Sequence, residues 1–277
     1  MTGETDDGRI LVLGATGSVG RRVAGLLREA GRPVTTASPS AAVRFDWTEP
    51  ATWDAAVDGA TGAFVMAPDG VPVDHAFLRR AADAGVRRLV LLSSRAVEAM
   101  GDERLLAAEA AVRDAGPAWS VVRADWFDQN FDEGVFRDAV LAGEVVVPVG
   151  DVRQAFVDAG DVAAVAVAVL LGKAATGATY DVTGPEALSF GEAVGVVARA
   201  AGRPVRHLGE PDDYWRTMTG SGLDAAQVRR EIEAFAALRA LGDDVPTRTV
   251  EQLTGRAATS FADYAADAAV RGAWRGA

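Results

Sequence analysis

The chain has 277 residues, 49% of them hydrophobic and 24% charged, which is enough to bury a large core in one or two domains. Its lack of cysteine excludes disulfides, thiolate metal sites and cysteine nucleophiles and fits a reducing cytoplasm, and its two histidines argue against a multi-histidine metal site. The net charge of −11 argues against nucleic acid, and no apolar run reaches the roughly 20 residues that span a bilayer, so we expect a cytoplasmic protein without a membrane segment.

Apolar runs alternate with amphipathic segments through the first half of the chain, after a polar, acidic stretch over residues 1–8 that we expect to be flexible. Such alternation is typical of a parallel sheet with helices on both faces. The pattern predicts strands over residues 10–13, 34–37, 43–45, 62–66, 88–92 and 119–123. It predicts helices over residues 18–29, 50–57, 73–84, 103–115 and 132–142, three of them followed by the C-terminal cap glycines Gly31, Gly85 and Gly116.

The second half is mostly helical. We expect strands over residues 145–148, 156–158 and 179–182. We expect helices over residues 162–171, 189–201 (capped by Ser189), 212–218, 224–241, 250–253 and 260–270. The predicted fold is α/β, with a doubly wound parallel sheet over residues 9–150. Residues 151–277 form a mixed region that contributes to the sheet and to a smaller, mostly helical C-terminal substrate lobe. The apolar positions of helix 224–241 pack either within the chain or across a homodimer.

The most informative motif is LVLGATGSVGRR, in which an apolar strand runs into three glycines at three-residue spacing. Gly14 lets the chain turn off the strand, Gly17 lets the backbone approach phosphate oxygens, and Gly20 lets the next helix pack close to the sheet. Free N–H groups and the positive end of the helix dipole attract a pyrophosphate, and the hydroxyls of Thr16 and Ser18 add contacts. We therefore expect a dinucleotide-binding protein.

The residues near the end of the second predicted strand bear on which dinucleotide binds. No carboxylate stands near Ser38 to accept the ribose hydroxyls of NAD, whereas Ser38, Ser40 and Arg44 suit a 2′-phosphate, which favours NADP(H) over NAD(H). The alternative is a serine-rich turn with Arg44 in solvent. Asp46 accepts a hydrogen bond from the adenine amino group in one interpretation and caps the next helix in the other.

Six blocks of sequence, in this order, resemble the NmrA-like group of atypical short-chain dehydrogenase/reductases, which bind NAD(P). They cover nearly the whole chain. The blocks are GATGSVG (14–20), AADAGVRRLVLLSS (81–94), WSVVRADWFDQNF (119–131), AFVDAGDVAAVAVAVL (155–170), YDVTGPEALSFGEAV (180–194) and LTGRAATSFADYAADAA (253–269). The resemblance implies a Rossmann domain, a nicotinamide cofactor and a smaller C-terminal substrate lobe.

The resemblance also implies roles for residues by position. For the cofactor, it implies pyrophosphate contacts from Gly14, Thr16, Gly17, Ser18, Val19 and Gly20, an adenosine 2′ contact from Ser38, adenine contacts from Asp46 and Trp47, ribose contacts from Met66, Ala67 and Pro68, and nicotinamide contacts from Ser93 and Ser94. It puts Trp126, Phe127 and Asn130 at the junction of cofactor and substrate. The two aromatic residues of this group are alternatively plain core.

Typical short-chain reductases protonate the substrate oxygen with a tyrosine that is activated by a lysine four residues further on. This chain has no such pair, because its only lysine is Lys173 and residue 169 is valine. Three functions remain open. They are an NAD(P)H-dependent reductase, a dinucleotide sensor that binds a partner protein without turnover, and a scaffold for a redox-neutral step such as coupling or rearrangement of an aromatic natural product.

We favour the reductase, acting on an acceptor that needs little acid help, such as a quinone, a conjugated enone or an aromatic polyketide. Ser94, Asn130 and Tyr214 are the candidate catalytic contacts. Tyr214 and Trp215 belong either to a lid helix over this small-molecule substrate or to an ordinary packed helix. The composition, rich in alanine, glycine, arginine and valine, is typical of a high-GC bacterium. A pocket lined by aromatic side chains favours an enzyme, whereas an open, flat apolar patch favours the sensor.

Overall fold

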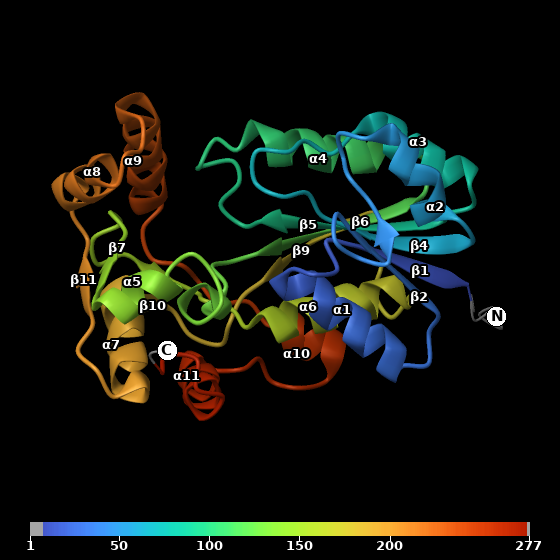
Figure 1. The fold of residues 1–277 in the computed structure, drawn as a ribbon. Coiled ribbons are helices and arrows are strands. Elements are labelled where there is room, and N and C mark those ends of the chain that lie inside the picture. The colour runs from blue at the N-terminus through green and yellow to red at the C-terminus, as the bar shows by residue number, and fades with distance from the viewer. Residues whose placement is uncertain (1–7, 276–277) are drawn as a thin grey trace.

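Seven parallel strands form a single sheet within residues 8–275, the part of the chain that this computed structural model describes. The flexible stretch expected over residues 1–8 lies, apart from Gly8, outside the described residues. The strands pair in the order β3-β2-β1-β4-β5-β6-β9 (Figure 1). Their bounds are β1 Arg9–Leu13, β2 Val34–Ser38, β3 Val43–Arg44, β4 Ala60–Val65, β5 Arg88–Ser94, β6 Ala118–Ala124 and β9 Ala178–Val182.

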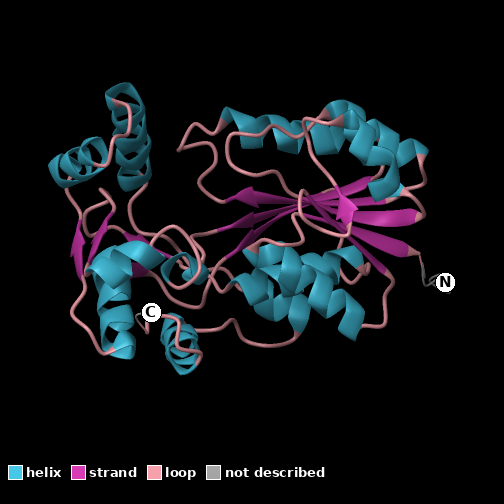
Figure 2. Cartoon of the chain, in the orientation of Figure 1, coloured by secondary structure: helices cyan, strands magenta, loops and turns pink. Residues whose placement is uncertain are grey.

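Helices cover both faces of this sheet, as expected for a doubly wound Rossmann fold (Figure 2). One face carries α1 (Ser18–Glu29), α6 (Ala159–Leu170) and α10 (Thr249–Thr254). The other face carries α2 (Trp53–Val57), α3 (His75–Asp83) and α4 (Glu103–Asp114). A 3-10 turn over Pro50–Thr52 leads into α2, so the helix predicted over residues 50–57 forms in two pieces. No helix within residues 8–275 is long and apolar enough to cross a bilayer.

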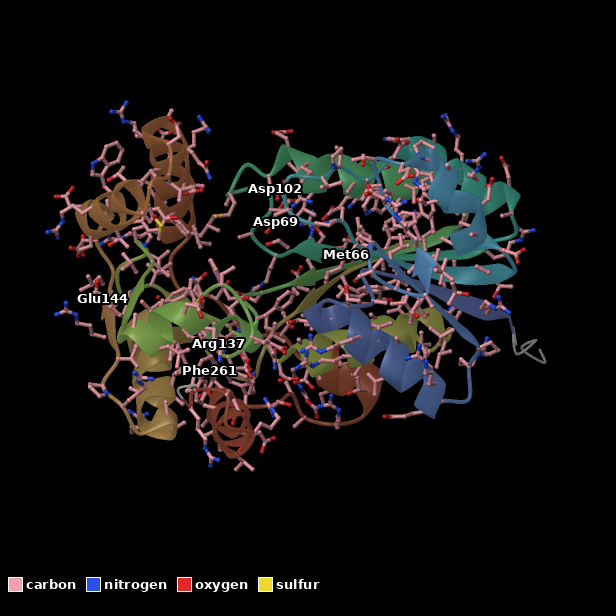
Figure 3. The ribbon with its side chains drawn as sticks, viewed as in Figure 1. Met66, Asp69, Asp102, Arg137, Glu144 and Phe261 are labelled. Carbon is pink, nitrogen blue, oxygen red and sulfur yellow. The ribbon has the colours of Figure 1, made fainter. Side chains whose placement is uncertain are left out.

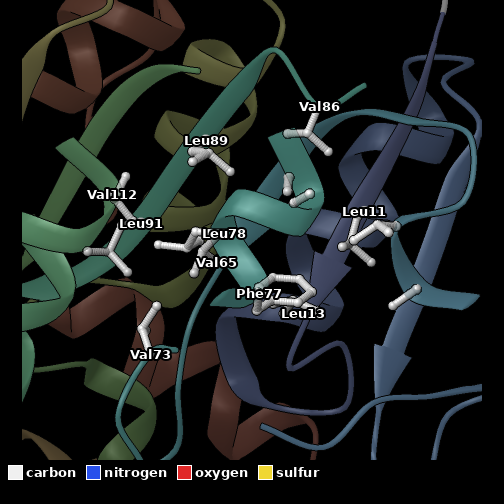
Figure 4. Close-up of a cluster of buried hydrophobic side chains, with 14 of the residues drawn as sticks. Leu11, Leu13, Val65, Val73, Phe77, Leu78, Val86, Leu89, Leu91 and Val112 are labelled. Carbon is white, nitrogen blue, oxygen red and sulfur yellow. The ribbon is translucent and has the colours of Figure 1, made fainter. Parts of the chain in front are cut away.

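Two apolar layers hold the helices to the sheet. Leu11 and Leu13 of β1 point into the layer under α2, α3 and α4, where they meet Phe77 (Figure 4). Ile10 and Val12 alternate with them and point into the layer under α1 and α6. Because both faces are covered, the central strands β1, β4 and β5 each contain a run of at least three consecutive apolar residues, which is why they stand out in the sequence.

The remaining elements form a lobe at the carboxyl ends of the strands (Figure 1). The lobe contains two short sheets, one pairing β7 with β11 in parallel and the other pairing β8 with β10 antiparallel. Its elements are α5 (Arg137–Ala142), β7 (Glu144–Val146), β8 (Arg153–Gln154), β10 (Leu188–Ser189), α7 (Phe190–Ala201), β11 (Arg206–Leu208), α8 (Pro211–Gly220), α9 (Ala225–Ala240) and α11 (Phe261–Val270). Between residues 151 and 277 the chain also supplies α6, β9 and α10 to the sheet layers. The domain boundary at residue 150 stays a prediction.

Several local expectations are confirmed. Helix α1 has its predicted bounds, and Gly31, Gly85 and Gly116 all have positive φ. The Ser189 hydroxyl accepts from the Glu192 N–H, while the Glu192 carboxylate accepts from the Ser189 N–H, which makes a capping box. The apolar side chains of α9 pack within the chain, against α8 and the lobe core.

One predicted helix begins later than expected, and one predicted strand is absent. The helix predicted over residues 132–142 begins only at Arg137, because the chain before it folds back in a tight turn. The turn is so close that a Cβ on Gly134 would lie 2.8 Å from the Asn130 Cα. The strand predicted over residues 156–158 is not formed, and only Val157 pairs, in an isolated bridge with Phe127. Residue 156 lies in the lobe core and residue 157 in the sheet core, so this segment crosses between two cores rather than along a sheet.

A buried carboxyl group lies where the lobe meets the sheet. Asp128 is fully buried, and its backbone N–H donates to the Val157 carbonyl at 2.9 Å. Neither oxygen of its carboxyl group has a hydrogen-bond partner within the described residues. Burial, reinforced by the nearby Asp158 and Asp161 carboxylates, raises the pKa of Asp128 well above its ordinary value. The folded protein therefore holds the Asp128 proton to a higher pH than the unfolded chain does.

We expect Asp128→Asn to stabilise the protein at pH 8 and to change little at pH 4. The folded state holds this proton while the unfolded chain releases it above about pH 4, so wild-type stability falls as the pH rises towards the folded pKa. The amide has no proton to hold and avoids this loss, by about 1 kcal/mol or more. Urea unfolding at the two pH values measures the difference.

The control is Asp138→Asn on α5, whose side chain is 95% exposed and whose loss should have the same small effect at both pH values. If Asp128→Asn is no more stabilising at pH 8 than at pH 4, Asp128 is ionised in the folded protein.

Candidate active site

The turn after β1 has two glycines under different constraints. A Cβ on Gly20 would lie 2.2 Å from the Gly14 carbonyl oxygen, so only glycine lets α1 seat on the turn. At Gly17 the nearest atom is the same oxygen at 3.4 Å, an ordinary contact, and Gly17 is exposed. The fold therefore requires Gly20, whereas the space over Gly17 is open to a ligand. Gly14 itself has a φ of +62°, the left-handed region that glycine adopts without strain.

The start of α1 carries no side-chain cap and no acidic residue in its first turn. Six other described helices begin with an Asp or Ser side chain that accepts from a first-turn N–H. The side chain of Val19 is buried in the sheet core, so Val19 presents only its backbone to this end of the helix. Uncapped N–H groups and the positive helix end fit a pyrophosphate.

The side of α1 is tied to the lobe through Glu133. Its carboxylate accepts from the Ser18 hydroxyl at 3.1 Å and from the Arg22 guanidinium at 2.8 Å, and it also pairs with Arg21. Burial alone would raise the pKa of Glu133, but the two arginines hold it below its ordinary value. The Ser18 hydroxyl is thus engaged by the lobe, which leaves anion binding at this turn mainly to the backbone.

Ser38 ends β2 and Arg44 ends the neighbouring strand β3, where the two residues pair; both are expected at the adenosine 2′ position. Ser38 is buried, and its hydroxyl accepts from the Ser40 N–H at 3.3 Å. Arg44 pairs with Glu49 at 2.6 Å, and both side chains are exposed. An exposed pair of this kind contributes only about 0–1 kcal/mol, so Arg44 exchanges Glu49 for another anion at little cost.

Asp46 and Trp47 follow β3. Asp46 accepts from the N–H and the hydroxyl of Thr48 at 2.8 and 2.7 Å, which closes a local turn rather than capping a helix. These hydrogen bonds lower the pKa of Asp46. Trp47 is buried, packs edge-on against Phe45, and donates its indole N–H to the Met66 carbonyl at 3.2 Å. Trp47 therefore fixes the end of β4 from within the core.

A cleft of about 620 Å³ opens at the carboxyl ends of β4, β5, β6 and β9. Such a volume is typical of small-molecule sites. Figure 3 shows Met66, Asp69 and Asp102 on the sheet side of this region, with the lobe opposite. Leu238 and Leu241, at the end of α9, line the lobe side. The cleft brings together the predicted residues Met66, Ala67, Ser93, Ser94, Trp126, Phe127 and Asn130, whereas Pro68 is exposed beside it.

The predicted polar residues of the cleft differ in whether their side chains already form hydrogen bonds within the protein. The side chains of Ser94 and Asn130 make no hydrogen bond to any described residue, so both can serve a ligand. Ser93 donates its hydroxyl to the fully buried Glu109 at 2.7 Å. Glu109 also accepts from Arg123 at 2.8 Å, and although burial opposes ionisation, these hydrogen bonds lower its pKa. Ser93 is thus part of a buried network beneath the cleft.

Trp126 belongs to both the core and the cleft, so the two alternatives for it do not exclude each other. It stacks with Phe136 and Phe235 in the lobe, at ring-centroid distances of 6.0 and 6.4 Å, and it also lines the cleft. Phe127 packs against the sheet core and lines the cleft as well. The two aromatic residues therefore form a wall that stays fixed without a ligand.

The structure does not bring Tyr214 and Trp215 to the cleft, which corrects their predicted catalytic and substrate roles. The Tyr214 hydroxyl donates to Glu231 of α9 at 2.9 Å, and burial together with that carboxylate raises its pKa. Trp215 lies 5.3 Å from the Arg229 guanidinium. These contacts join α8 to α9, which covers the apolar side of α8. The end of α9, rather than α8, lines the cleft.

The cleft also contains an acidic residue that the sequence analysis missed. Asp125 follows β6 directly, with its side chain 5% exposed, and it accepts from the Trp126 N–H at 2.7 Å. Arg95 lies 3.3 Å from Asp125 and 2.8 Å from Asp244, which is in the segment after α9. Burial and the hydrogen bond and charge of Asp244 raise the pKa of Asp125 to about 7. The signal in the sequence was an acid placed directly after a buried strand.

The charges of the cleft are unequal. Its described lining residues include five aspartates against two arginines, and no tyrosine, lysine or histidine. Lys173 lies at the opposite edge of the sheet, because it follows α6, whose last carbonyls accept hydrogen bonds from Arg88, the first residue of β5. Among the described lining residues, the side chains suited to proton transfer are therefore carboxyl and hydroxyl groups.

No family model matches the sequence. The chain is 35% identical over 277 residues to a (4-alkanoyl-5-oxo-2,5-dihydrofuran-3-yl)methyl phosphate reductase of Streptomyces griseus, covering 93% of this chain and 97% of the relative. It is 33% identical over 290 residues to an NAD(P)H azoreductase of Xenophilus azovorans, covering 95% and 99%. Its fold is similar to that of an NADPH-dependent quinone oxidoreductase of Escherichia coli in complex with NADPH, with a TM-score of 0.77 and 18% identity over 94% of this chain and 98% of the other.

Gly17→Ala and Gly20→Ala should separate binding from folding. We expect Gly17→Ala to keep the wild-type melting temperature and to weaken NADPH binding at least about tenfold, because its Cβ projects where phosphate oxygens approach. We expect Gly20→Ala to destabilise the fold by about 1–3 kcal/mol through its clash with the Gly14 carbonyl. Thermal unfolding and calorimetric titration measure the two effects. Equal effects of the two substitutions on both measurements would contradict this division.

Proposed function

Since the chain belongs to the NmrA-like family of atypical short-chain dehydrogenase/reductases and is an NAD(P)H-dependent oxidoreductase, we propose that it reduces a neutral conjugated acceptor. The acceptor is a quinone, an enone or an aromatic polyketide-type molecule. The observation that carries the proposal is the cleft at the carboxyl edge, with a fixed aromatic wall and unpaired polar side chains beside the glycine turn. A lined cleft of this kind favours an enzyme over a sensor, for which a flat apolar patch was expected.

The names of the compared proteins support a conjugated acceptor. The ring named for the Streptomyces griseus relative has an alkene conjugated to both a ketone and a lactone carbonyl. The other two names give an azo compound and a quinone. All three take up a hydride into a system that spreads the resulting negative charge, so they need little help from a strong acid.

The charge of the cleft supports an acceptor without a phosphate group. Five aspartates and two arginines line it, so a dianionic substituent would meet net repulsion. The name of the Streptomyces griseus relative includes a phosphate, and we propose that this chain differs from it in that respect.

We propose that NADP(H) is the preferred cofactor. Backbone groups of residues 17–20 hold its pyrophosphate, and Arg44 turns from Glu49 to the 2′-phosphate. Met66, Ala67 and Pro68 lie along the ribose, and Ser93 and Ser94 lie at the nicotinamide. When bound, the nicotinamide supplies the hydride.

The residues of the cleft orient the acceptor and exclude water. Trp126 and Phe127 give its ring an apolar surface that is already fixed by core packing. The Ser94 hydroxyl and the Asn130 amide have no partner within the described chain, so they can donate hydrogen bonds to the substrate oxygen where negative charge develops.

The acceptor class is tested by following NADPH oxidation with a quinone, an enone and a phosphate-bearing analogue of each. We expect the neutral acceptors to be reduced with a kcat/KM at least about tenfold above that of their phosphorylated counterparts. This preference should shrink as the salt concentration rises, because it depends on charge. Faster reduction of the phosphorylated compounds would contradict the proposal.

The cofactor preference is tested with Arg44→Ala. We expect it to weaken NADPH binding about tenfold, by loss of a charge-assisted hydrogen bond to phosphate, and to leave NADH binding unchanged. The matched variant Glu49→Gln, which frees Arg44 from its pair, should strengthen NADPH binding. Calorimetric titration measures the affinities of the wild type and both variants for NADPH and NADH. An equal loss for both cofactors in Arg44→Ala would contradict the 2′-phosphate contact.

A further inference from the structure

The position of Asp125 makes it a candidate to react with a substrate. Ser94, the last residue of β5, pairs with Ala124, the last residue of β6. Asp125 is the next residue after Ala124, so it leaves the sheet next to the end of β5. Both residues line the cleft, and so does Asn130. An acceptor that fills this cleft therefore meets the side chains of Ser94, Asn130 and Asp125.

Burial and neighbouring carboxyl groups favour the protonated form of Asp125. The charged groups that line the cleft around it are Arg95 after β5, Asp181 on β9 and Asp244 after α9. Asp125 and Asp244 share Arg95, which offsets only one of their two negative charges, and Asp181 adds a third carboxyl group to the lining. Asp125 and Asp244 both contact the same guanidinium nitrogen of Arg95, at 3.3 and 2.8 Å, so their carboxyl groups lie close together and each disfavours a negative charge on the other. Burial is the main cause of the raised pKa of Asp125, and the charge of Asp244 adds to it.

We propose that Asp125 is the proton donor of the reduction, with Asp244 as the positioning residue that keeps a proton on it. The inference rests on the proposed function. Asp125 would take the place of the tyrosine and lysine that typical short-chain reductases use, which this cleft lacks.

The step balances in atoms and electrons. A hydride from the reduced cofactor forms a C–H bond at the electrophilic carbon of a conjugated carbonyl compound, whose π electrons move to the oxygen. The O–H bond of Asp125 breaks, and its proton forms a bond with that enolate, so the substrate gains one hydride, which carries the two electrons, and one proton. The carboxylate of Asp125 is 5% exposed and that of Asp244 is 25% exposed, so the proton is replaced from solvent through Asp244.

The proposal is tested with 2-cyclohexen-1-one, menadione and a cationic triarylmethane dye as hydride acceptors. The enone and the quinone need a proton, whereas the dye cation becomes neutral on hydride uptake alone. At pH 7 we expect Asp125→Asn to lower kcat for the enone about 100-fold and to leave the dye rate unchanged. A merely structural role for Asp125 would lower both rates together.

The pH profile adds a second readout. Wild-type kcat for the enone should fall about tenfold per pH unit above the pKa of Asp125, and Asp125→Asn should lose this limb. Asp244→Asn removes the partner that raises this pKa, so it should move the limb to lower pH. The control is Asp138→Asn, which lies outside the cleft and should keep the wild-type profile.

An infrared titration of the cofactor-free protein tests the protonation of Asp125 without turnover. We expect a protonated carboxyl band that titrates near pH 7 and is absent in Asp125→Asn. The inference is overturned if Asp125→Asn keeps the wild-type enone rate and alkaline limb, or if no band of this kind is lost. If the wild-type protein oxidises NADPH with none of the acceptors, the proposed function fails and the donor role falls with it.

Discussion

Parallel pairing of the strands is the constraint on which the other features of this molecule depend. Because every strand of the sheet runs in the same direction, the residues that follow β1, β4, β5, β6 and β9 all reach the same edge. The glycine turn, Met66, Ser94 and Asp125 thus come together although they are far apart in the sequence. The same edge leaves strand ends and loops that need a cover, which is where the lobe lies.

The lobe is joined to this edge by more than apolar packing. The chain leaves the sheet after β6, returns through α6 and β9, leaves again, and returns once more through α10. Ionic contacts add to these crossings, with Arg95 of the sheet side holding Asp244 of the lobe side, and Arg22 of α1 holding Glu133. Substrate cleft and phosphate turn are therefore each bordered by a charged contact between the same two parts of the molecule.

What the sequence could predict follows from the range of the forces involved. Buried strands and α1 were predictable because apolar runs, glycines and caps act over a few residues, as Ser189 also illustrates. The roles given to Tyr214 and Trp215 failed because helical periodicity identifies an apolar side but not the element that covers it. Asp125 was missed because its chemistry depends on Asp244, which only the folded chain brings near. A fully buried Asp128 had no local signal at all, since a short acidic stretch is normally exposed.

Gly17 and Gly20 also differ in how readily evolution could replace them. Gly20 is required by the backbone of the fold itself, whereas only the proposed ligand would require Gly17. A lineage that abandoned its nucleotide would be free to replace Gly17 while natural selection on folding alone preserved Gly20. In such a descendant Gly20 would remain, and a side chain at position 17 would indicate that the ancestral ligand no longer binds.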